Sequence, residues 1–470
     1  MSAAEAAILT LYYVVLAALA VYSIHRFYLV RLRRRSPEPQ RPRGDAYPPV
    51  TIQLPLYNEP NVAERLIEAV ARIEYPGALD IQVLDDSTDE TSTIVANAIA
   101  RMRNVNIAHI RRGSRDGFKA GALAYGMSRS DAELFAVFDA DFVPPPDVLL
   151  RMVRYFADEA VGMVQARWTH LNRDESLLTR VQALFLDAHF AVESAARNFG
   201  GRFFNFNGTA GVWRREAIDE AGGWSSSTLT EDLDLSYRAQ LAGWRFVFLN
   251  DLEVPAELPA AMNGFQDQQH RWTKGSIQTA RKLLGDIARS DFDRSIKTEA
   301  LFHLTNNAAY LLSLMLALTI VPALLIRYAH GLTWTFVIDF ALFLASSGSV
   351  LLFYREGQHW AGRARPPLRE LLAVLPVGMG MSVRNAVAVV EGLLQRGGYF
   401  ERTPKVGWGG GPSPSARLRM TGVAELALAV FFAGVFVAFA LAGRWLSLPF
   451  LFLFVSGYAF VALNRFRTTA

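Results

Sequence analysis

The sequence contains no cysteine among its 470 residues. This absence excludes disulfides, zinc–thiolate sites, iron–sulfur clusters and a cysteine nucleophile, and it leaves the redox compartment undetermined. The chain also has almost no excess of either charge, because it contains 48 lysines and arginines and 44 aspartates and glutamates, which gives a net charge of +4. So small an excess in so long a chain argues against nucleic acid as a partner. Hydrophobic residues make up 51% of the chain and charged residues 20%, which excludes a disordered protein.

Five long stretches of the chain carry almost no charge. A helix that crosses the hydrocarbon layer of a membrane needs about 20 apolar residues. Runs of about this length lie at residues 6–24, 304–326, 331–354, 426–443 and 445–464, and Asp339 is the single charged residue within them. A soluble protein could bury one such run but hardly five, so we predict an integral membrane protein. Because arginines follow the first run and no basic residue precedes it, we expect a membrane helix over residues 1–30 rather than a cleaved signal peptide.

Basic residues flank three of these runs on one side. The first run is followed by Arg26, Arg31, Arg33, Arg34 and Arg35, the third by Arg355, Arg363, Arg365 and Arg369, and the last by Arg465 and Arg467. By the positive-inside rule these flanks are cytoplasmic. The rule predicts a protein of the cell membrane or inner membrane whose N-terminus lies on the outer side. The polar domain at residues 47–290 would lie in the cytoplasm.

A sixth apolar stretch has a different character. Residues 371–395 include Arg384, Asn385 and Glu391, and basic residues flank both ends. We therefore predict a helix that lies at the cytoplasmic face of the membrane instead of a sixth span. It would precede a loop at residues 396–420, within a membrane region that extends over residues 300–470.

The polar domain alternates between strand-like and helix-like segments. Short β-branched runs lie at residues 50–55, 80–85, 104–110, 133–139 and 162–168, and helical spacing occurs at residues 62–73 and 91–102. This alternation predicts an α/β domain with a doubly wound, mostly parallel sheet. Ligands of such sheets bind beyond the carboxyl ends of the strands.

Acidic pairs follow two of these predicted strands. Asp85 and Asp86 end the second strand, where their mutual repulsion makes sense if one of them accepts hydrogen bonds from a ligand base or sugar hydroxyl. Asp139 and Asp141 follow the fourth strand. In an extended chain these two carboxylates would face the same side and could share one hard cation.

Three further motifs carry groups suited to a phosphate-bearing sugar ligand. Lys119 stands at a glycine-bordered helix start where it could hold phosphate, although an ordinary solvated lysine is by itself the commoner case. Glu231 and Asp232 open an amphipathic helix and could be catalytic or merely favour the positive helix end. Arg271 could clamp phosphate and Trp272 could stack on a sugar, or the two could be a snorkelling arginine beside a packed aromatic ring.

Taken in order, these motifs resemble those of the membrane-integrated family-two glycosyltransferases, the group that contains cellulose, chitin and hyaluronan synthases. The segments QVLDDSTD, KAGAL, FDADF, VQARW, FNGTAGVWR, EAGGW and QQHRW are most similar to the plant cellulose synthase-like A and C proteins. Those proteins make mannan or glucomannan and the glucan backbone of xyloglucan. The likeness covers about residues 49–280 and implies a GT-A fold, with inverting, metal-dependent transfer of a hexose from UDP-glucose or GDP-mannose to a β-1,4-linked polysaccharide.

The resemblance also implies roles for individual side chains. It implies that the nucleotide is contacted by Tyr57, Glu59, Asp85 and Asp86, and that Mg²⁺ or Mn²⁺ is held by Asp139 and Asp141. It further implies that the leaving group is contacted by Lys119 and Arg271, and the acceptor by Gln268 and Trp272. Inversion requires one base at the acceptor face, and we assign that role to Asp232, beside Glu231. A retaining mechanism would need a second carboxylate as nucleophile, and the sequence offers no clear candidate.

A second likeness lies in the membrane region. Residues 398–407, GYFERTPKVG, resemble the F-x-V-T-x-K gating loop of bacterial cellulose synthase, with Phe400, Thr403 and Lys405 at the matching positions. Arg402 replaces the valine of that motif, and FNGTAG stands where cellulose synthases have a cysteine-containing acceptor motif. The loop could close over a bound donor, or its basic side chains could hold anionic lipid headgroups.

The motifs leave two other functions open. A glycosyltransferase that adds one or a few sugars to a lipid, as the ceramide glucosyltransferases do, would share them. A catalytically silent nucleotide-sugar sensor would keep the fold without a base. The gating-loop likeness and the five spans favour a polymerase that passes its chain through its own membrane helices. Its partners would be a nucleotide sugar, a glycan or lipid acceptor and membrane lipids, whereas donor sugar, linkage and oligomeric state leave no trace in the sequence.

Overall fold

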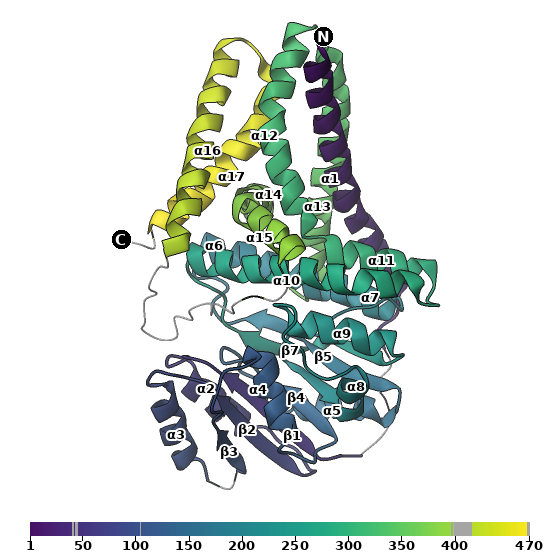
Figure 1. Ribbon diagram of the computed structural model, residues 1–470, viewed down its shortest axis with the longest axis vertical. Helices are drawn as coiled ribbons and strands as arrows, with labels where there is room; N and C mark the ends of the chain where they lie inside the picture. The colour runs from purple at the N-terminus through teal and green to yellow at the C-terminus, as the bar shows by residue number, and fades with distance from the viewer. Residues whose placement is uncertain (40–41, 43–45, 104, 396–397, 399–415, 468–470) are drawn as a thin grey trace.

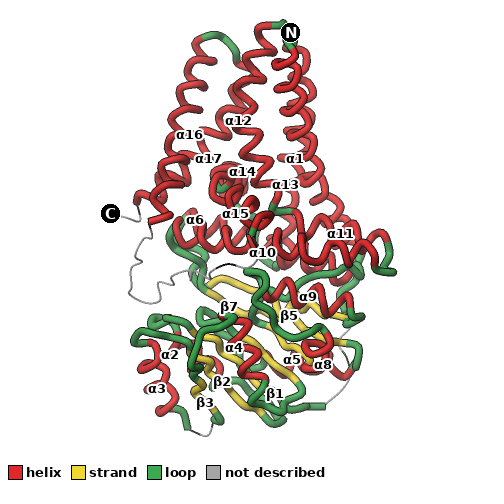
Figure 2. Tube along the Cα trace, in the orientation of Figure 1, coloured by secondary structure: helices red, strands yellow, loops and turns green. Residues whose placement is uncertain are grey.

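The computed structural model describes residues 1–39, 42, 46–103, 105–395, 398 and 416–467. Long helices form one end of the molecule, an α/β domain forms the other, and a layer of helices lies between them (Figure 1). Figure 2 shows that the strands are confined to the α/β domain.

The α/β domain is built on a seven-stranded sheet in the order β3-β2-β1-β4-β6-β5-β7. Its strands are β1 (Val50–Leu56), β2 (Leu79–Asp85), β3 (Ile107–Ile110), β4 (Leu134–Val137), β5 (Val161–His170), β6 (Gly211–Arg214) and β7 (Arg245–Ala256). Only β6 runs antiparallel to its neighbours, β4 and β5. The predicted mostly parallel sheet is therefore confirmed, and all five predicted strands are present. Strands β6 and β7 were not predicted.

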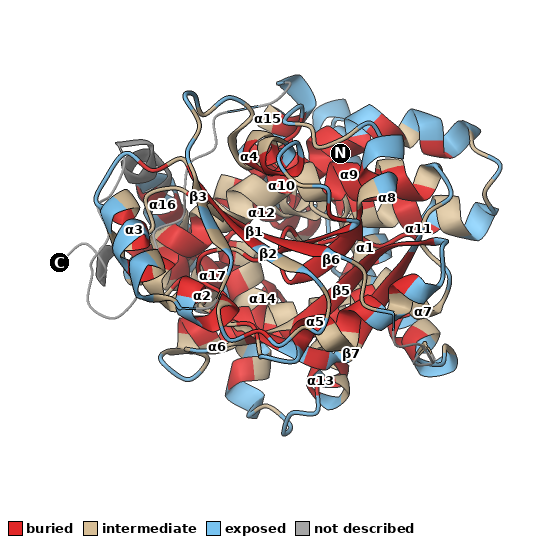
Figure 3. Cartoon of the chain, turned by 90° about the horizontal axis from the view of Figure 1, so that it is seen from below, coloured by how far each residue is buried: buried red, intermediate tan, exposed pale blue. Residues whose placement is uncertain are grey.

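Both faces of the sheet are covered by helices. Along β4, Leu134 and Ala136 belong to a buried cluster with side chains of α2 (Ala63–Val70), α3 (Thr91–Arg101) and α5 (Val148–Val153). Phe135 and Val137 belong instead to a cluster with α4 (Phe118–Met127), α8 (Arg215–Glu220) and α9 (Glu231–Leu241). Because alternate side chains of a strand point to opposite faces, this division confirms the doubly wound arrangement. Figure 3, which views the domain from below, shows the central strands as buried.

Among the residues that the structure describes, five helices are long and apolar enough to cross a membrane, so the chain is an integral membrane protein. They comprise α1 (Ala3–Arg35), α12 (Ala308–Ala329), α13 (Phe336–Trp360) together with the short η3 (Thr333–Thr335) before it, α16 (Ala416–Leu441), and α17 (Leu448–Arg467) after η4 (Trp445–Ser447). They match the five predicted runs. The side of the membrane on which each end lies stays a prediction.

The stretch predicted as one interfacial helix forms two helices. These are α14 (Leu368–Gly380) and α15 (Ser382–Leu394), which meet at a bend of 50° and could together count as a sixth span. Near the bend, Gly380 touches Gly457 of α17 so closely that a Cβ atom on Gly380 would lie 2.3 Å from the Gly457 carbonyl oxygen. The bent pair is thus packed against the membrane helices, and its depth in the membrane stays a prediction.

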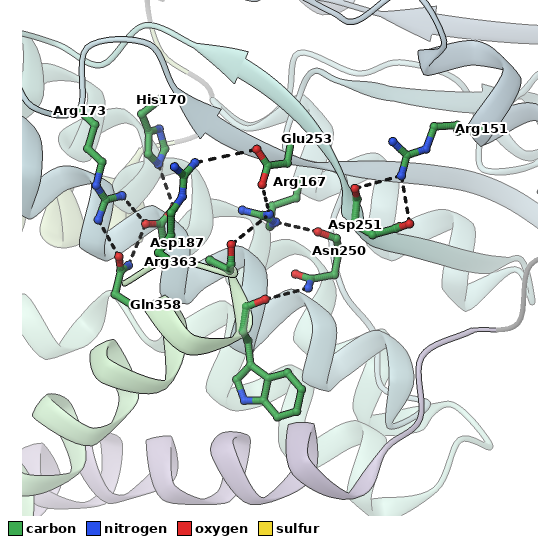
Figure 4. Close-up of polar contacts among 12 residues, drawn as sticks. Arg151, Arg167, His170, Arg173, Asp187, Asn250, Asp251, Glu253, Gln358 and Arg363 are labelled. Atoms are coloured by element: carbon green, nitrogen blue, oxygen red, sulfur yellow. Dashed lines mark hydrogen bonds and ion pairs between the residues drawn. The ribbon is translucent and has the colours of Figure 1, made fainter. Parts of the chain in front are cut away.

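The intermediate layer joins the sheet to the membrane helices. It contains α6 (Leu177–Ala188), a π-helical turn η2 (His189–Ser194), α7 (Ala195–Phe199), α10 (Met262–Arg289) and α11 (Arg294–Thr305). Figure 4 shows the polar contacts that fix the C-terminal end of α13 to this layer and to the sheet. Asp187 of α6 is fully buried and accepts hydrogen bonds from Arg173 at 2.5 Å and from Gln358 of α13 at 2.8 Å. Asn250 of β7 donates to the Trp360 carbonyl oxygen at 3.0 Å.

Candidate active site

A cavity of about 190 Å³ opens beyond the carboxyl ends of β1, β2 and β4. This is the edge at which a doubly wound sheet is expected to bind its ligand. The predicted site residues in its wall are Tyr57, Glu59, Asp86, Lys119, Asp139, Asp141, Glu231, Asp232, Gln268, Arg271 and Trp272. The fold thus brings together motifs that are spread over more than 200 residues of sequence. We call this space the donor pocket.

Asp85 is the predicted nucleotide contact that does not line the donor pocket. Its carboxylate is buried and accepts hydrogen bonds from the Ser92 hydroxyl at 2.6 Å and the Ser87 backbone NH at 2.9 Å. Its Oδ2 also lies 2.9 Å from Nε2 of His109. Burial alone would raise the pKa of Asp85, but these hydrogen bonds outweigh that effect and hold the pKa below its usual value. Its neighbour Asp86 faces the pocket and pairs with Arg112, whose Nε donates to it at 2.9 Å.

Asp139 and Asp141 lie in a turn after β4, not in the extended segment that we predicted. The Phe142 backbone NH donates to the Asp139 carbonyl oxygen at 3.1 Å, which closes the turn. Both carboxylates nevertheless line the donor pocket. Lys119 pairs with Asp139 and also donates to the Gly208 carbonyl oxygen at 2.8 Å. Although burial alone would lower the pKa of Lys119, the Asp139 and Glu231 carboxylates raise it, so the ammonium stays charged.

Glu231 and Asp232 begin helix α9 and face the positively charged side chains of the pocket. Burial and then the neighbouring Glu231 carboxylate raise the pKa of Asp232 to about 7, against the opposing effect of Lys119. Burial raises the pKa of Glu231 as well. Gly208 adopts φ +84°, and a Cβ atom there would lie 3.1 Å from Oδ2 of Asp232, so a glycine lets the backbone approach this carboxylate.

Helix α10 supplies the opposite wall. Gln268, Arg271 and Trp272 are spaced by three and four residues, so they share one face of the helix, and all three line the donor pocket. Burial lowers the pKa of Arg271 below its usual value. The surrounding carboxylates, Asp267 first among them, oppose this effect but do not outweigh it.

Three further residues of the pocket wall were not among the predicted site residues. The guanidinium of Arg115 lies 3.3 Å from the centre of the Tyr57 ring, a cation–π contact. Trp168 packs edge-on against Phe142 with ring centres 5.1 Å apart. Asn207 lies in the same wall, in the FNGTAG segment. Trp168 and Asn207 lie in the VQARW and FNGTAG segments, which belong to the family resemblance, but the sequence had assigned no role to either residue.

A second, larger cavity of about 470 Å³ begins where the donor pocket ends. The two share a wall formed by Trp168, Asn207, Thr230, Asp232 and Trp272. From there the larger cavity continues between α1, α12, α13, α14 and α17. We call it the membrane cavity.

Each of the long helices around the membrane cavity presents one stripe of side chains to it. On α1 the stripe is Tyr12, Leu16, Leu19, Ser23 and Arg26. At 1.5 Å per residue it extends for roughly 21 Å, against a hydrocarbon layer about 30 Å thick. Asp232 therefore stands at the entrance to a cavity that follows the membrane helices over most of their apolar length.

The predicted gating-loop residues Phe400, Thr403 and Lys405 lie outside the residues that the structure describes. Their proposed contact with a donor stays a prediction.

Known proteins resemble this chain in sequence and in fold. The model of the glycosyltransferase like family 2 matches residues 48–275. A probable glucomannan 4-β-mannosyltransferase 10 of Arabidopsis thaliana is 45% identical over 254 residues, 52% of this chain and 46% of that protein. Glucomannan 4-β-mannosyltransferase 1 of Oryza sativa subsp. japonica is also 45% identical over 254 residues, 52% of this chain and 49% of its own length. The match thus spans about half the length of these relatives.

Among solved structures, the mannosyltransferase PcManGT from Pyrobaculum calidifontis, in complex with GDP-Man and Mn²⁺, has a similar fold. The TM-score is 0.56 at 20% sequence identity, over 82% of this chain and 99% of that one. The family match, the relatives and the mostly parallel sheet agree with the family resemblance of the motifs. Residues 48–275 of this chain are thus similar to the glycosyltransferase like family 2, and the chain has the GT-A fold.

Proposed function

We propose that the chain is an inverting, metal-dependent hexosyltransferase that extends a β-1,4-linked polysaccharide from a nucleotide sugar and passes the product along its membrane helices. The observation that carries this proposal is the position of Asp232, in the wall shared by the donor pocket and the membrane cavity. A base at that point can take the proton of an acceptor hydroxyl that enters from the membrane cavity. The names of the relatives favour mannose as the sugar and GDP-mannose as the donor.

The donor pocket offers a separate group for each part of a nucleotide sugar. Tyr57, Glu59 and Asp86 would contact the nucleoside, with Arg115 stacked on the Tyr57 ring. Lys119 and Arg271 would hold the diphosphate, because cations stabilise the charge that develops on it as the sugar departs. Asp85 would act indirectly, by holding the β2 end in place through its own hydrogen bonds.

The acceptor would lie on the other side of Asp232. Gln268 can donate and accept hydrogen bonds with sugar hydroxyls, and the indole of Trp272 offers a surface on which a sugar ring can stack. Trp272 lines both cavities, so an acceptor held against it would reach Asp232 without crossing the donor pocket.

The pair Asp139 and Asp141 fits a divalent cation. Within the described ranges no group of three or more His, Asp or Glu side chains could hold a metal ion alone. Two carboxylates nevertheless suit Mg²⁺ or Mn²⁺, which keep water and substrate phosphate oxygens as their other ligands. When bound, the ion would supply positive charge at the leaving diphosphate. Asp141 would hold the ion together with Asp139, whose carboxylate also pairs with Lys119.

The proposal is tested by supplying purified full-length protein in lipid nanodiscs with radiolabelled GDP-mannose or UDP-glucose. We expect mannose to enter a long product, with β-1,4 linkages by methylation analysis. A product of one or a few sugars attached to lipid would replace the polymer proposal with the glycolipid alternative. Binding of either donor without any release of nucleoside diphosphate would indicate a sensor.

The pKa of Asp232 leads to an expected pH dependence. A general base acts only when it is deprotonated, so with a pKa of about 7 the transfer rate should fall as the pH drops through 7. Well below that pH the rate should fall by about tenfold for each pH unit. Initial rates at saturating donor between pH 5 and 9 would show this. A flat profile down to pH 5 would mean that Asp232 titrates like an ordinary carboxylate or does not act as the base.

A further inference from the structure

A buried polar cluster lies among the membrane helices at the far end of the membrane cavity. It consists of Tyr12 of α1, Arg327 of α12 and Asp339 of α13, which are 2%, 0% and 1% exposed. The Tyr12 hydroxyl donates to Oδ1 of Asp339 at 3.0 Å, and Arg327 pairs with Oδ2 of the same carboxylate. Arg327 also donates to the Tyr13 hydroxyl at 3.3 Å. We call Tyr12, Arg327 and Asp339 the distal cluster.

The distal cluster marks the limit of the membrane cavity on three helices. Tyr12 and Asp339 are the lining residues of α1 and α13 that lie farthest from the α/β domain. On α12 the lining stripe ends at Ile320, and Arg327 follows about two helical turns later. Beyond the cluster, Glu5 and His330 form a half-exposed ion pair at 3.2 Å, and neither lines the cavity. A chain that moved from Asp232 along the cavity would therefore meet the distal cluster last.

Packing alone does not account for these charges. A buried ion pair in a membrane segment pays a large desolvation cost, and apolar side chains of similar volume would hold the helices together as well or better. The surroundings are apolar or aromatic, and the guanidinium carbon of Arg327 lies 4.4 Å from the centre of the Phe336 ring. Among the described residues, Nη2 of the Arg327 guanidinium has no hydrogen-bond partner. The cluster thus keeps hydrogen-bonding capacity that the helices do not use.

We propose that the distal cluster is an exit site for a neutral glycan chain. Sugar hydroxyls both donate and accept hydrogen bonds, so they can replace Tyr12 and Arg327 on the Asp339 carboxylate and can accept from the guanidinium. Tyr12 and Phe343 both line the membrane cavity, and their rings offer apolar surfaces against which a pyranose can pack. Because Arg327 and Asp339 balance one another, the site would favour an uncharged polymer. This inference rests on the proposed function, because the distal cluster would be the last part of the protein that the polysaccharide product contacts.

The test separates chain growth from sugar transfer. Two variants are made in the full-length protein, Asp339→Asn and the double change Arg327→Met with Asp339→Leu. The first weakens the charge-assisted hydrogen bonds and keeps the shape; the second replaces the pair by apolar side chains, which should fold even if the first does not. We expect both to shorten the polymer several-fold, because a stalled chain stops elongation. The rate of the first transfer to a short soluble oligosaccharide should stay near that of the wild type.

Glu5→Gln is the matched control. It removes the ion pair with His330 next to the same helices but outside the cavity, and glutamine can keep the helix cap with Ser2. Wild-type product length in this control, together with short products in both distal-cluster variants, would support an exit site. Unchanged length in those variants would overturn it, as would an equal loss of the first transfer, which would show a merely structural role. A wild type that adds only one sugar would instead disprove the proposed polymer function itself.

Discussion

Changing Asp232 to asparagine should lower the transfer rate by roughly 10²–10⁴-fold, the usual contribution of a positioned general base. The amide keeps the size of the carboxylate and can still accept the hydrogen bond that the Leu233 backbone NH donates to Oδ1 at 2.8 Å. It cannot take a proton from an acceptor hydroxyl. Donor affinity should therefore stay close to the wild-type value. Titration calorimetry with GDP-mannose and single-turnover transfer to an oligosaccharide would measure the two quantities separately.

Glu231→Gln is the informative comparison for this change. The two carboxylates are adjacent in sequence, but Glu231 lines only the donor pocket, whereas Asp232 also lines the membrane cavity. We expect Glu231→Gln to act mainly on donor affinity. If Glu231→Gln stopped turnover with donor binding intact while Asp232→Asn did not, the base would be Glu231. A loss of donor affinity in Asp232→Asn as large as its loss of rate would make Asp232 a binding residue.

Most of the sheet could be predicted because its central strands are buried on both faces and appear as continuous apolar runs. The two strands that were missed lack this signal. Strand β6 is central and buried, but Val212 and Trp213 are its only large apolar side chains, so it shows no continuous apolar run. Strand β7 contains the polar segment around Asn250 and Asp251 and ends near Pro255, and its register against β5 shifts between Ala166 and Arg167. A bulged strand with polar residues in its middle resembles a loop when only the sequence is considered.

Residues that line the donor pocket could be named from the sequence, but their orientations could not. Asp85 and Asp86 are consecutive, and successive side chains of a strand point in opposite directions. At most one of them could face a ligand site, and only the structure shows that Asp86 is the one that lines the donor pocket. The pair Asp139 and Asp141 reaches the same pocket through a turn, which a pattern based on extended chain cannot represent.

The membrane cavity was out of reach for a related reason. The apolar runs predicted five helices, because length and hydropathy belong to each segment alone. Which stripe of each helix faces a cavity depends on its neighbours in the fold. Asp339 stood out as the single charge inside a run, yet its partner Arg327 lies just past the end of another run and had no visible connection to it.

Removing the divalent cation should abolish transfer, because the negative charge that develops on the leaving nucleoside diphosphate would lose its main stabiliser. We expect EDTA to stop the wild type and Mg²⁺ or Mn²⁺ to restore it. Asp141→Ala should be inactive at any metal concentration, since Asp139 alone would remain and is already paired with Lys119.

Electron paramagnetic resonance of Mn²⁺ in the presence of GDP gives a readout that does not depend on turnover, and Asp141→Ala should lose the bound signal. Asp86→Asn is the control in the same pocket. Because Asp86 pairs with Arg112, this change should weaken donor binding but leave the requirement for metal unchanged. Full activity of the wild type in chelator, or a normal Mn²⁺ signal in Asp141→Ala, would show that these carboxylates serve the donor in another way.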